Sequence, residues 1–380
     1  MGDVEDAPRG LKGLVVAETA LGDVRGEEGF YHYRQYSAPE LAEQRTFEDV
    51  AQLLIDGSLP DAGGRERFAA EYRPRRKLPD AVARVVPAVA DASASPYTSL
   101  RTLLSHVAGV EAMPAIVDAD AATLRANVLR LSAVAPTVVA AVHRAAQGLD
   151  PVAPRDDLGD AANYLWMING TEAAPELARA LDQYLVLVLD HGFNASTFTA
   201  RVVASTGADV GAAVVAALGA LSGPRHGGAP SRALDMLDAI GTPDRAEAWV
   251  TDAVTRGERI MGFGHAVYRT ADPRSKMLRS IAERLGGPLV DLAVEVEATV
   301  ERVLADLKPN QRLYANVEFY AGVVMHQCGL PRELFTPTFG VSRIVGWGAQ
   351  VLEQAQDSAI IRPSARYVGP PPPAPVPVAP

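Results

Sequence analysis

Cysteine is almost absent from this chain, since Cys328 is the only one among 380 residues. A single thiol excludes internal disulfides and any zinc site built from cysteines, and it is typical of a protein from a reducing cytoplasm. Net positive charge is lacking too, because 46 acidic residues outnumber 36 lysines and arginines and leave a formal charge of −10. We therefore expect no nucleic-acid partner, although this charge is compatible with a local basic pocket for an anionic ligand.

Long hydrophobic runs are also missing. The longest uncharged apolar run, residues 210–224, stops at Arg225 and is too short and too rich in alanine and glycine to span a bilayer comfortably. The acidic start, Met-Gly-Asp-Val-Glu-Asp, lacks the apolar core of a signal peptide. With 48% hydrophobic and 22% charged residues, the chain has the composition of a globular protein large enough for two lobes. We expect a cytoplasmic protein with no membrane partner.

Several common site signatures are lacking. The chain has neither the phosphate-binding loop that ends in Gly-Lys-Ser/Thr nor the Gly-x-Ser-x-Gly turn of serine hydrolases. Gly262-Phe263-Gly264 begins like a dinucleotide fingerprint, but the sixth position is Val267 and no repeat of strand-helix-strand units surrounds it. Histidines at the short spacing of a zinc site are missing as well. We expect no nucleotide hydrolysis, no serine-hydrolase chemistry and no bound metal.

The pattern that does recur along the chain is helical. Residues 13–37 hold short β-branched and aromatic runs between glycines, typical of small strands. Apolar residues at helical spacing, many with capping residues, follow them. We expect an all-α fold with minor N-terminal β elements. The clearest helices are predicted at 46–57, 176–189, 209–221, 243–256, 273–285, 290–307, 316–327 and 338–354.

Three segments predict irregular structure. Residues 59–79 and 147–154 are rich in glycine, arginine and proline and indicate loops. Residues 369–380 are rich in proline and indicate an extended polyproline II tail. A disordered tail explains this composition more simply than a ligand for a partner protein.

The most informative stretch is 261–274, Met-Gly-Phe-Gly-His-Ala-Val-Tyr-Arg-Thr-Ala-Asp-Pro-Arg. His265 follows a Gly-x-Gly bend. Asp272 has the character of an N-cap and Pro273 that of the first helical residue, so Arg274 falls in the first turn, where the helix dipole disfavours a cation. A bound anion, held by the guanidinium and by the free N–H groups of the helix start, would explain an arginine there.

Four more residues are candidates for chemistry. His191 and His226, like His265, have glycines close by in the sequence. Each of the three alone is as consistent with a structural role as with a functional one. The three together favour a functional role. Glu318 follows a cap at Asn316, so the helix dipole favours its ionised form, as a general base requires, although acidic first-turn residues are also common on surfaces. Arg343 lies within an apolar helix and needs a buried partner, either a structural carboxylate or that of a ligand.

In these residues and their order the chain resembles citrate synthases. The resemblance runs from Tyr31-His-Tyr-Arg-Gln-Tyr-Ser-Ala-Pro-Glu and Leu53-Leu-Ile-Asp-Gly-Ser-Leu-Pro through the His191 and His226 segments to 262–274 and Val341-Ser-Arg, and leaves out 63–156 and the tail. It implies an almost all-helical homodimer with shared active sites, or a higher oligomer. It also implies a large domain of residues 1–228 and 331–368, a mobile CoA-binding domain of 229–330, and a tail of 369–380.

The resemblance further implies the condensation of acetyl-CoA with oxaloacetate, followed by thioester hydrolysis to citrate and CoA. No cofactor is bound permanently and no metal is needed, because the CoA thioester is a co-substrate. Glu318 would take the methyl proton, His226 would hold the thioester oxygen, and His265 would hold and protonate the ketone oxygen. The residues implied for the dicarboxylate are His191, Arg274, Arg343 and, from the neighbouring subunit, Arg362. Those implied for CoA are Arg259, Met261, Gly262, Gly264 and Arg269.

The sequence departs from the family pattern at three places. Glu318 stands where an aspartate is usual, Gln35 where a glycine is common, and Arg225 where an apolar residue is common. A misplacement of about 1 Å can cost on the order of 10²-fold in rate, so the longer Glu318 indicates a slower base, a repositioned base or a changed substrate. The alternatives are a 2-methylcitrate synthase that uses propionyl-CoA and a weakly active regulatory paralogue.

Overall fold

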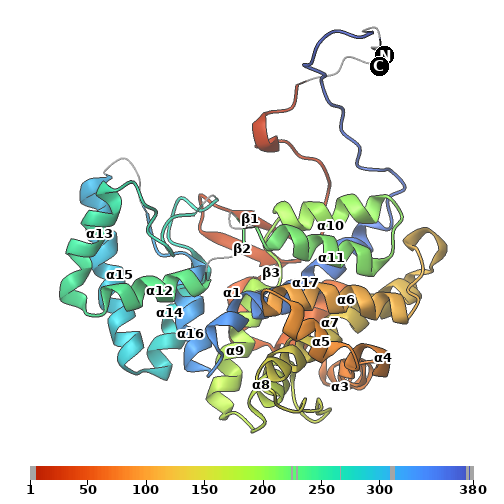
Figure 1. The fold of residues 1–380 in the computed structure, drawn as a ribbon, viewed down its shortest axis with the longest axis horizontal. Helices are drawn as coiled ribbons and strands as arrows, with labels where there is room; N and C mark the ends of the chain where they lie inside the picture. Colours follow the sequence, from red (N-terminus) through yellow and green to blue (C-terminus); the bar gives the residue numbers. More distant parts are fainter. Residues whose placement is uncertain are drawn as a thin grey trace.

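The computed structural model describes residues 6–223, 226–227, 230–265, 267–308, 313–373 and 376. The described chain is almost wholly helical, with one small sheet, which confirms the predicted all-α class (Figure 1). The first helices are α1 (Ala38–Gln44), α2 (Phe47–Asp56), α3 (Ala62–Tyr72), α4 (Asp80–Ala83), α5 (Val86–Ala92), α6 (Pro96–Val110), α7 (Ala121–Ala146), α8 (Asp160–Asn169), α9 (Pro175–Val188), α10 (Ala195–Ser205) and α11 (Val210–Leu221). The later ones are α12 (Pro230–Ile240), α13 (Ala246–Thr255), α14 (Pro273–Leu285), α15 (Pro288–Leu307), α16 (Val317–Gln327) and α17 (Phe335–Gln354).

The sheet lies where the sequence predicts strands. It joins β1 (Gly22–Arg25), β2 (Phe30–Tyr33) and β3 (Tyr36–Ser37) in that order, each antiparallel to the next. Tyr31 and Tyr33 of the middle strand are both buried. Their hydroxyls donate to the carbonyls of Leu187 and Val186 at 3.0 and 2.9 Å. The sheet is therefore fastened to the end of α9, immediately before His191.

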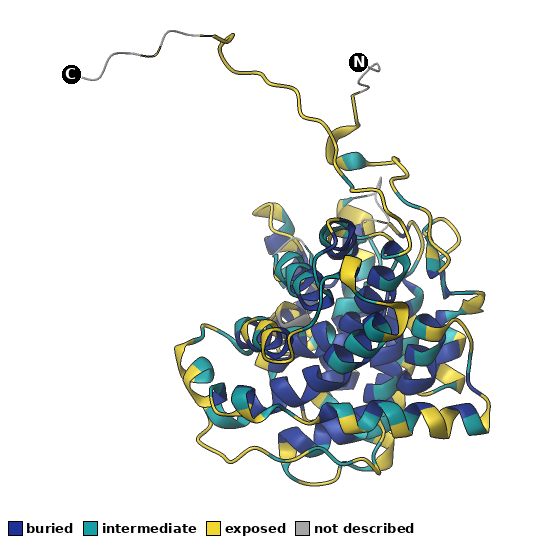
Figure 2. Cartoon of the chain, turned by 90° about the vertical axis from the view of Figure 1, so that its right-hand side faces the viewer, coloured by how far each residue is buried: buried dark blue, intermediate teal, exposed yellow. Residues whose placement is uncertain are grey.

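Helices α7 and α17 form the centre of the larger helical group. They pack on one another, and α5, α6, α10 and α11 surround them. By length and composition α7 is the one described helix that could cross a membrane, but 83% of its apolar window is buried inside the protein. Figure 2 shows buried residues concentrated through the middle of this helical body, while most of the described residues that lead to the two ends are exposed. The burial of α7 is that of a core helix.

Helices α12 to α16 form a second group, at the left of Figure 1. Within it α12 and α14 pack on α16, and α13 packs on α15. Contacts of α14 and α16 with α9, and of α12 with α17, join this group to the larger one. The described segments that lead to the two ends extend from the body on one side, where Arg366 pairs with Asp6 at 2.7 Å.

Helix ends that depend on local capping are confirmed. Helix α14 covers the predicted residues, with Asp272 as its N-cap, and Asn316 caps α16 as predicted. Residues 149–155 are irregular, as expected for the predicted loop, and 369–373 form neither helix nor strand. Most of the rest of the tail lies outside the described residues.

The prediction of a loop at 59–79 is wrong. Helix α3 begins there after Asp61, whose carboxylate accepts from the Gly64 N–H at 2.6 Å. Phe68 is buried on its inner face, and Arg65 binds the carboxylate of Asp49 on α2 with two hydrogen bonds. These tertiary partners outweigh the weak helix propensity of a segment with two glycines in its first turn.

Candidate active site

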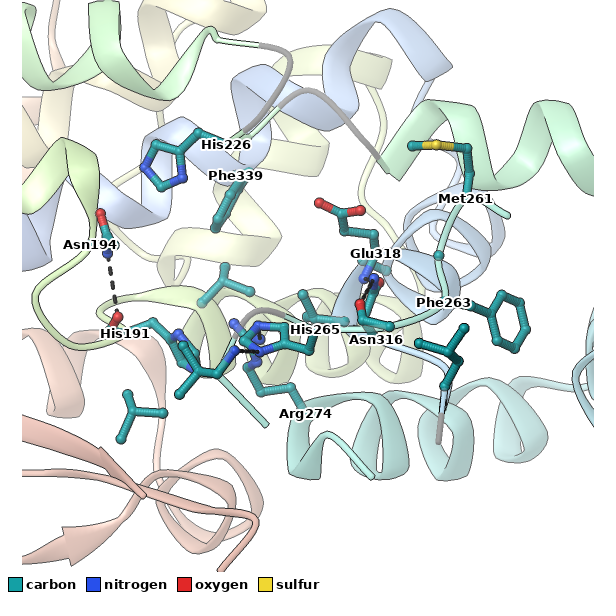
Figure 3. A pocket seen from close by; sticks show the side chains of 18 of the residues that line it. His191, Asn194, His226, Met261, Phe263, His265, Arg274, Asn316, Glu318 and Phe339 are labelled. Atoms are coloured by element: carbon teal, nitrogen blue, oxygen red, sulfur yellow. Dashed lines mark hydrogen bonds between the residues drawn. The ribbon is translucent and has the colours of Figure 1, made fainter. Parts of the chain in front are cut away.

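One cavity of about 900 Å³ opens between the two helical groups, and residues from both line it. Ten of the predicted site residues lie there: His191, His226, Arg259, Met261, Gly262, Gly264, His265, Arg274, Glu318 and Arg343. Figure 3 shows Glu318, His226 and His265 around the same hollow, with Arg274 beside His265. Segments that are more than a hundred residues apart in sequence therefore contribute to one site.

Two predicted residues are not part of this cavity. The Arg269 side chain is 57% exposed and lies 3.9 Å from the carboxylate of Glu27. Arg362 is exposed in the extended segment that follows α17. A CoA role for Arg269 and a role for Arg362 in a neighbouring subunit's site stay predictions. Arg225 lies outside the described residues.

His265 has a defined hydrogen position. Its Nδ1 accepts from the backbone N–H groups of Val267 and Tyr268, both at 3.0 Å. Burial, followed by the charge of Arg274, lowers the pKa of His265 to about 4, so the ring is neutral at pH 7. A neutral ring with Nδ1 as acceptor carries its hydrogen on Nε2. His265 therefore offers a hydrogen-bond donor without carrying a positive charge.

Arg274 adds a second donor at the same point. Its Nη2 lies 3.2 Å from the Nε2 of His265. Both nitrogens carry hydrogen, so this contact is not a hydrogen bond between them. Two donors that converge in this way favour an oxygen of a bound carbonyl or carboxylate as their shared acceptor.

Asp272 holds Arg274 in place. Its Oδ1 accepts from the Arg274 backbone N–H and from Nε, both at 3.0 Å, and its Oδ2 accepts from Nη2 at 2.7 Å. Oδ2 also accepts from the backbone N–H of Val317 at 3.2 Å. The carboxylate thus resolves the unfavourable position of a cation in the first turn, and it ties the start of α14 to the start of α16, next to Glu318.

His226 is a neutral histidine on the other side of the cavity. Its Nε2 lies 2.8 Å from the Ser196 hydroxyl and accepts from the Ser196 backbone N–H at 3.3 Å. Burial, followed by the charge of Arg343, lowers the pKa of His226 to about 4. Asn194, the cap of α10, also bonds the hydroxyl and backbone of Ser196 and fixes its position.

Glu318 is a carboxylate with a raised pKa. Asn316 caps α16 by accepting from the Glu318 N–H at 3.0 Å, which places Glu318 in the first turn, as predicted. Burial raises the pKa of Glu318 to about 7, although the charges of Arg274 and Arg232 act in the opposite direction. A carboxylate that titrates near pH 7 is a stronger base than one with an ordinary pKa.

Arg343 is buried without a carboxylate beside it in the described part of the chain. Its side chain is 2% exposed, Nε donates to the Val188 carbonyl at 2.8 Å, and the guanidinium lies over the Phe339 ring, 4.8 Å from the centroid. Burial lowers the pKa of Arg343, an effect that the charge of Asp190 opposes. Of the two partners that the sequence leaves open, the carboxylate of a ligand fits this arrangement.

The loop that precedes His265 is bonded to the start of α16. Gly264 donates to the Tyr314 carbonyl and Asn316 to the Gly262 carbonyl, each at 2.8 Å. The Asn316 side chain also donates to the Gly264 carbonyl at 2.9 Å. Gly262 has a φ of +80°, and a Cβ there would lie 3.0 Å from the Cβ of Phe319. The loop therefore requires glycine for its backbone conformation and for its close approach to the helix of Glu318.

Comparisons with known proteins identify the family of this chain. Residues 10–364 match the family model described as citrate synthase, C-terminal domain. The citrate synthase of Deinococcus radiodurans is 40% identical over 362 residues, which are 95% of each chain. The chain belongs to the citrate synthase family. The match includes 63–156, so the expectation that citrate synthase resemblance leaves this region out is wrong.

Solved citrate synthases share the fold of this family member. The citrate synthase of Pyrobaculum aerophilum is 35% identical, with a TM-score of 0.87 over 99% of this chain and 97% of the other. The citrate synthase of Thermoplasma acidophilum, solved as a ternary complex with carboxymethyl coenzyme A and oxaloacetate, is 28% identical in sequence. Its TM-score is 0.90 over 99% of both chains.

Two basic residues that no sequence motif indicated, Arg232 and Lys308, also line the cavity. Arg232 lies in the first turn of α12, as Arg274 does in α14, so the same helix-dipole argument indicates it. Lys308 ends α15, where a cation is favourable without any ligand, and no local signal distinguishes it.

Proposed function

We propose that the residues of this cavity condense the acetyl group of acetyl-CoA with oxaloacetate, and that water then hydrolyses the resulting thioester to release citrate and CoA. The observation that carries the proposal is the arrangement of one carboxylate with a raised pKa, two neutral histidines and two buried guanidiniums around one cavity. This set combines a base, two donors for developing oxyanions and two groups that match a dicarboxylate.

The first step is the removal of a methyl proton. Thioester methyl protons are weakly acidic, so a base needs help from a donor at the enolate oxygen. Glu318 takes the proton in its ionised form. A ring N–H of neutral His226 donates to the thioester oxygen as negative charge develops on it.

The second step is the attack of the enolate on the ketone. The oxaloacetate carbonyl oxygen lies at the point where the Nε2–H of His265 and the Nη2 of Arg274 converge, and His265 protonates it as the new bond forms. His191, Arg274 and Arg343 hold the two carboxylates. Because these groups are buried, their interactions with the substrate are little screened by water.

CoA lies along the loop of Arg259, Met261, Gly262 and Gly264. These backbone groups contact the adenine, while Arg269 and the two basic residues that the sequence missed neutralise phosphates. CoA is a co-substrate here, and the reaction requires no permanently bound cofactor.

We also propose that domain closure and dimer formation contribute to catalysis. Residues 229–330 form the mobile domain, between the large-domain segments 1–228 and 331–368, and it closes over oxaloacetate to exclude water from the enolate. Two copies form a homodimer in which Arg362 reaches the neighbouring site. The enzyme acts in the cytoplasm.

The proposal is tested by CoA release from acetyl-CoA with oxaloacetate present or omitted. Oxaloacetate-dependent release supports it, and hydrolysis that is independent of oxaloacetate, or no release, contradicts it. Propionyl-CoA in competition measures acyl preference, because a pocket distinguishes one methylene by about 1–3 kcal/mol. A specificity constant at least several-fold higher for acetyl-CoA is expected.

A further inference from the structure

Tyr268 lies beside the two histidines that the proposed function assigns to oxaloacetate, although it does not line the cavity itself. Its side chain is 4% exposed. The ring centroid lies 4.8 Å from that of His265 and 5.6 Å from that of His191, and the Arg274 guanidinium is 5.8 Å from it. Tyr268 therefore contacts three groups that face the substrate.

The hydroxyl of Tyr268 bonds one of these histidines. The phenolic oxygen lies 2.9 Å from the Nε2 of His191. In the described part of the chain, this nitrogen is the acceptor available to the phenol hydrogen, since the structure gives the hydroxyl no other hydrogen bond. A buried phenol whose hydrogen has one available acceptor donates to it, because an unsatisfied buried donor costs about 1–3 kcal/mol. His191 Nε2 is then an acceptor.

This bond determines what His191 can offer to an anion. Burial, followed by the charges of Arg274 and Arg343, lowers the pKa of His191 well below 6.5, so the ring is neutral. A neutral ring that accepts at Nε2 carries its hydrogen on Nδ1, for which no protein partner is described. His191 lines the cavity, so this N–H is free to donate to a carboxylate. The opposite tautomer would present a lone pair there and repel the anion.

The backbone of Tyr268 acts on the other histidine. Its N–H donates to the Nδ1 of His265 at 3.0 Å, which leaves the hydrogen of His265 on Nε2. One residue thus fixes two rings in opposite tautomers: the hydroxyl sets His191 to Nδ1–H, and the amide sets His265 to Nε2–H. In both rings, the tautomer leaves an N–H that can donate a hydrogen bond to the substrate.

We propose that Tyr268 is a positioning residue that prepares His191 to bind a carboxylate of the 2-oxo dicarboxylic acid, by donating its hydroxyl hydrogen to Nε2. The inference rests on the proposed function for the identity of the acid. The tautomer of His191 is a property of the free enzyme and can be measured without turnover.

The test compares Tyr268→Phe with wild type. The variant removes the hydroxyl but keeps the ring and the amide. We expect KM for oxaloacetate to rise roughly tenfold or more, because the variant loses a charge-assisted hydrogen bond to the substrate. We expect kcat to change by less than about twofold, because binding alone is affected. In ring ¹⁵N NMR of the ligand-free enzyme, His191 should change from Nδ1–H toward Nε2–H, while His265 stays Nε2–H because backbone amides fix it.

Tyr31→Phe is the matched control. The Tyr31 ring also lies near His191, with centroids 5.3 Å apart, and near Arg274, but its hydroxyl donates to the Leu187 carbonyl. We expect this variant to keep the wild-type His191 tautomer and KM for oxaloacetate within about twofold. Circular dichroism and melting temperature establish that both variants fold.

An unchanged His191 tautomer in Tyr268→Phe overturns the proposal, as does a fall in kcat with no change in KM. An equal rise in KM in both variants overturns it as well, because the effect would then come from packing. If wild type shows no oxaloacetate-dependent turnover, the proposed function fails, while the NMR comparison still decides whether Tyr268 sets the tautomer.

Discussion

The Nη2 of Arg274 lies 3.2 Å from the Nε2 of His265, and both atoms carry hydrogen. Each nitrogen is held by other bonds: Asp272 fixes the guanidinium, and two backbone N–H groups fix the ring. The protein therefore keeps two donors closer together than their mutual repulsion favours. Such preorganisation lets a substrate oxygen bind between them without a rearrangement at the moment of reaction.

Asp272→Asn should be strongly destabilising. Burial would raise the pKa of Asp272, but the charge and hydrogen bonds of Arg274 outweigh it and lower that pKa. Removal of the negative charge leaves a buried guanidinium without its partner, which costs about 3–5 kcal/mol. Chemical denaturation at pH 7 measures this loss. Asp252→Asn, which breaks the exposed pair with Arg256 on α13, should cost less than about 0.5 kcal/mol; equal losses would contradict this account of Asp272.

The pH dependence of catalysis should follow Glu318. Its raised pKa of about 7 means that kcat/KM for acetyl-CoA falls below pH 7, approaching tenfold per pH unit. His226 and His265, with pKa values near 4, stay neutral in this range and add no further transition between pH 6 and 9. Steady-state rates from pH 5.5 to 9 test this. A profile that is flat between pH 5.5 and 8 would show that Glu318 is not the titrating base.

Glu318→Gln should stabilise the fold at alkaline pH. The folded pKa of about 7 exceeds the ordinary 4.5, so between these values the unfolded chain binds fewer protons and wild-type stability falls as pH rises. At about 1.4 kcal/mol per pKa unit, the loss is on the order of 3–4 kcal/mol above pH 7. Denaturation at pH 5 and pH 8, at fixed protein concentration, should show a stabilisation by the variant that is larger at pH 8. Exposed Glu66→Gln on α3 serves as the control, and the same difference in both variants would refute the account.

Gly262→Ala should weaken acyl-CoA binding through a steric contact. The new Cβ would meet the Cβ of Phe319 at 3.0 Å and displace the helix of Glu318. Gly257 is the matched control, because its φ of +76° resembles the +80° of Gly262 but a Cβ there meets nothing within 4 Å. Both variants carry about 1–2 kcal/mol of backbone strain. We expect KM for acetyl-CoA to rise roughly tenfold or more in Gly262→Ala alone, on the order of a lost 1.4 kcal/mol contact; a similar rise in Gly257→Ala would show that strain is responsible.

Local signals in the sequence account for much of this site. Asp272 before Pro273, and Asn316 before Glu318, determine where two helices begin, and so the positions of Arg274 and Glu318 were predictable. Arg343 was predictable as a buried cation in need of a partner. In each case the informative feature was a conflict between a charged residue and its expected local surroundings.

Other features depend on contacts between distant segments. Helix α3 is stabilised by the pairing of Arg65 with Asp49, which a propensity argument does not include. His226 is positioned by Ser196, and the tautomer of His191 is set by Tyr268; both partners come from other parts of the chain. Local sequence therefore indicated which residues form the site, but not which of their nitrogens carry hydrogen.

The central claim is that Glu318 removes the methyl proton, and CoA release by Glu318→Gln tests it most directly. Oxaloacetate and acetyl-CoA affinities, measured by calorimetry, should stay within a few-fold of wild type, since the variant keeps the shape of the side chain. The account predicts that kcat falls by about 10²–10⁴-fold, the contribution of a positioned general base. A kcat within tenfold of wild type in the folded variant would contradict it.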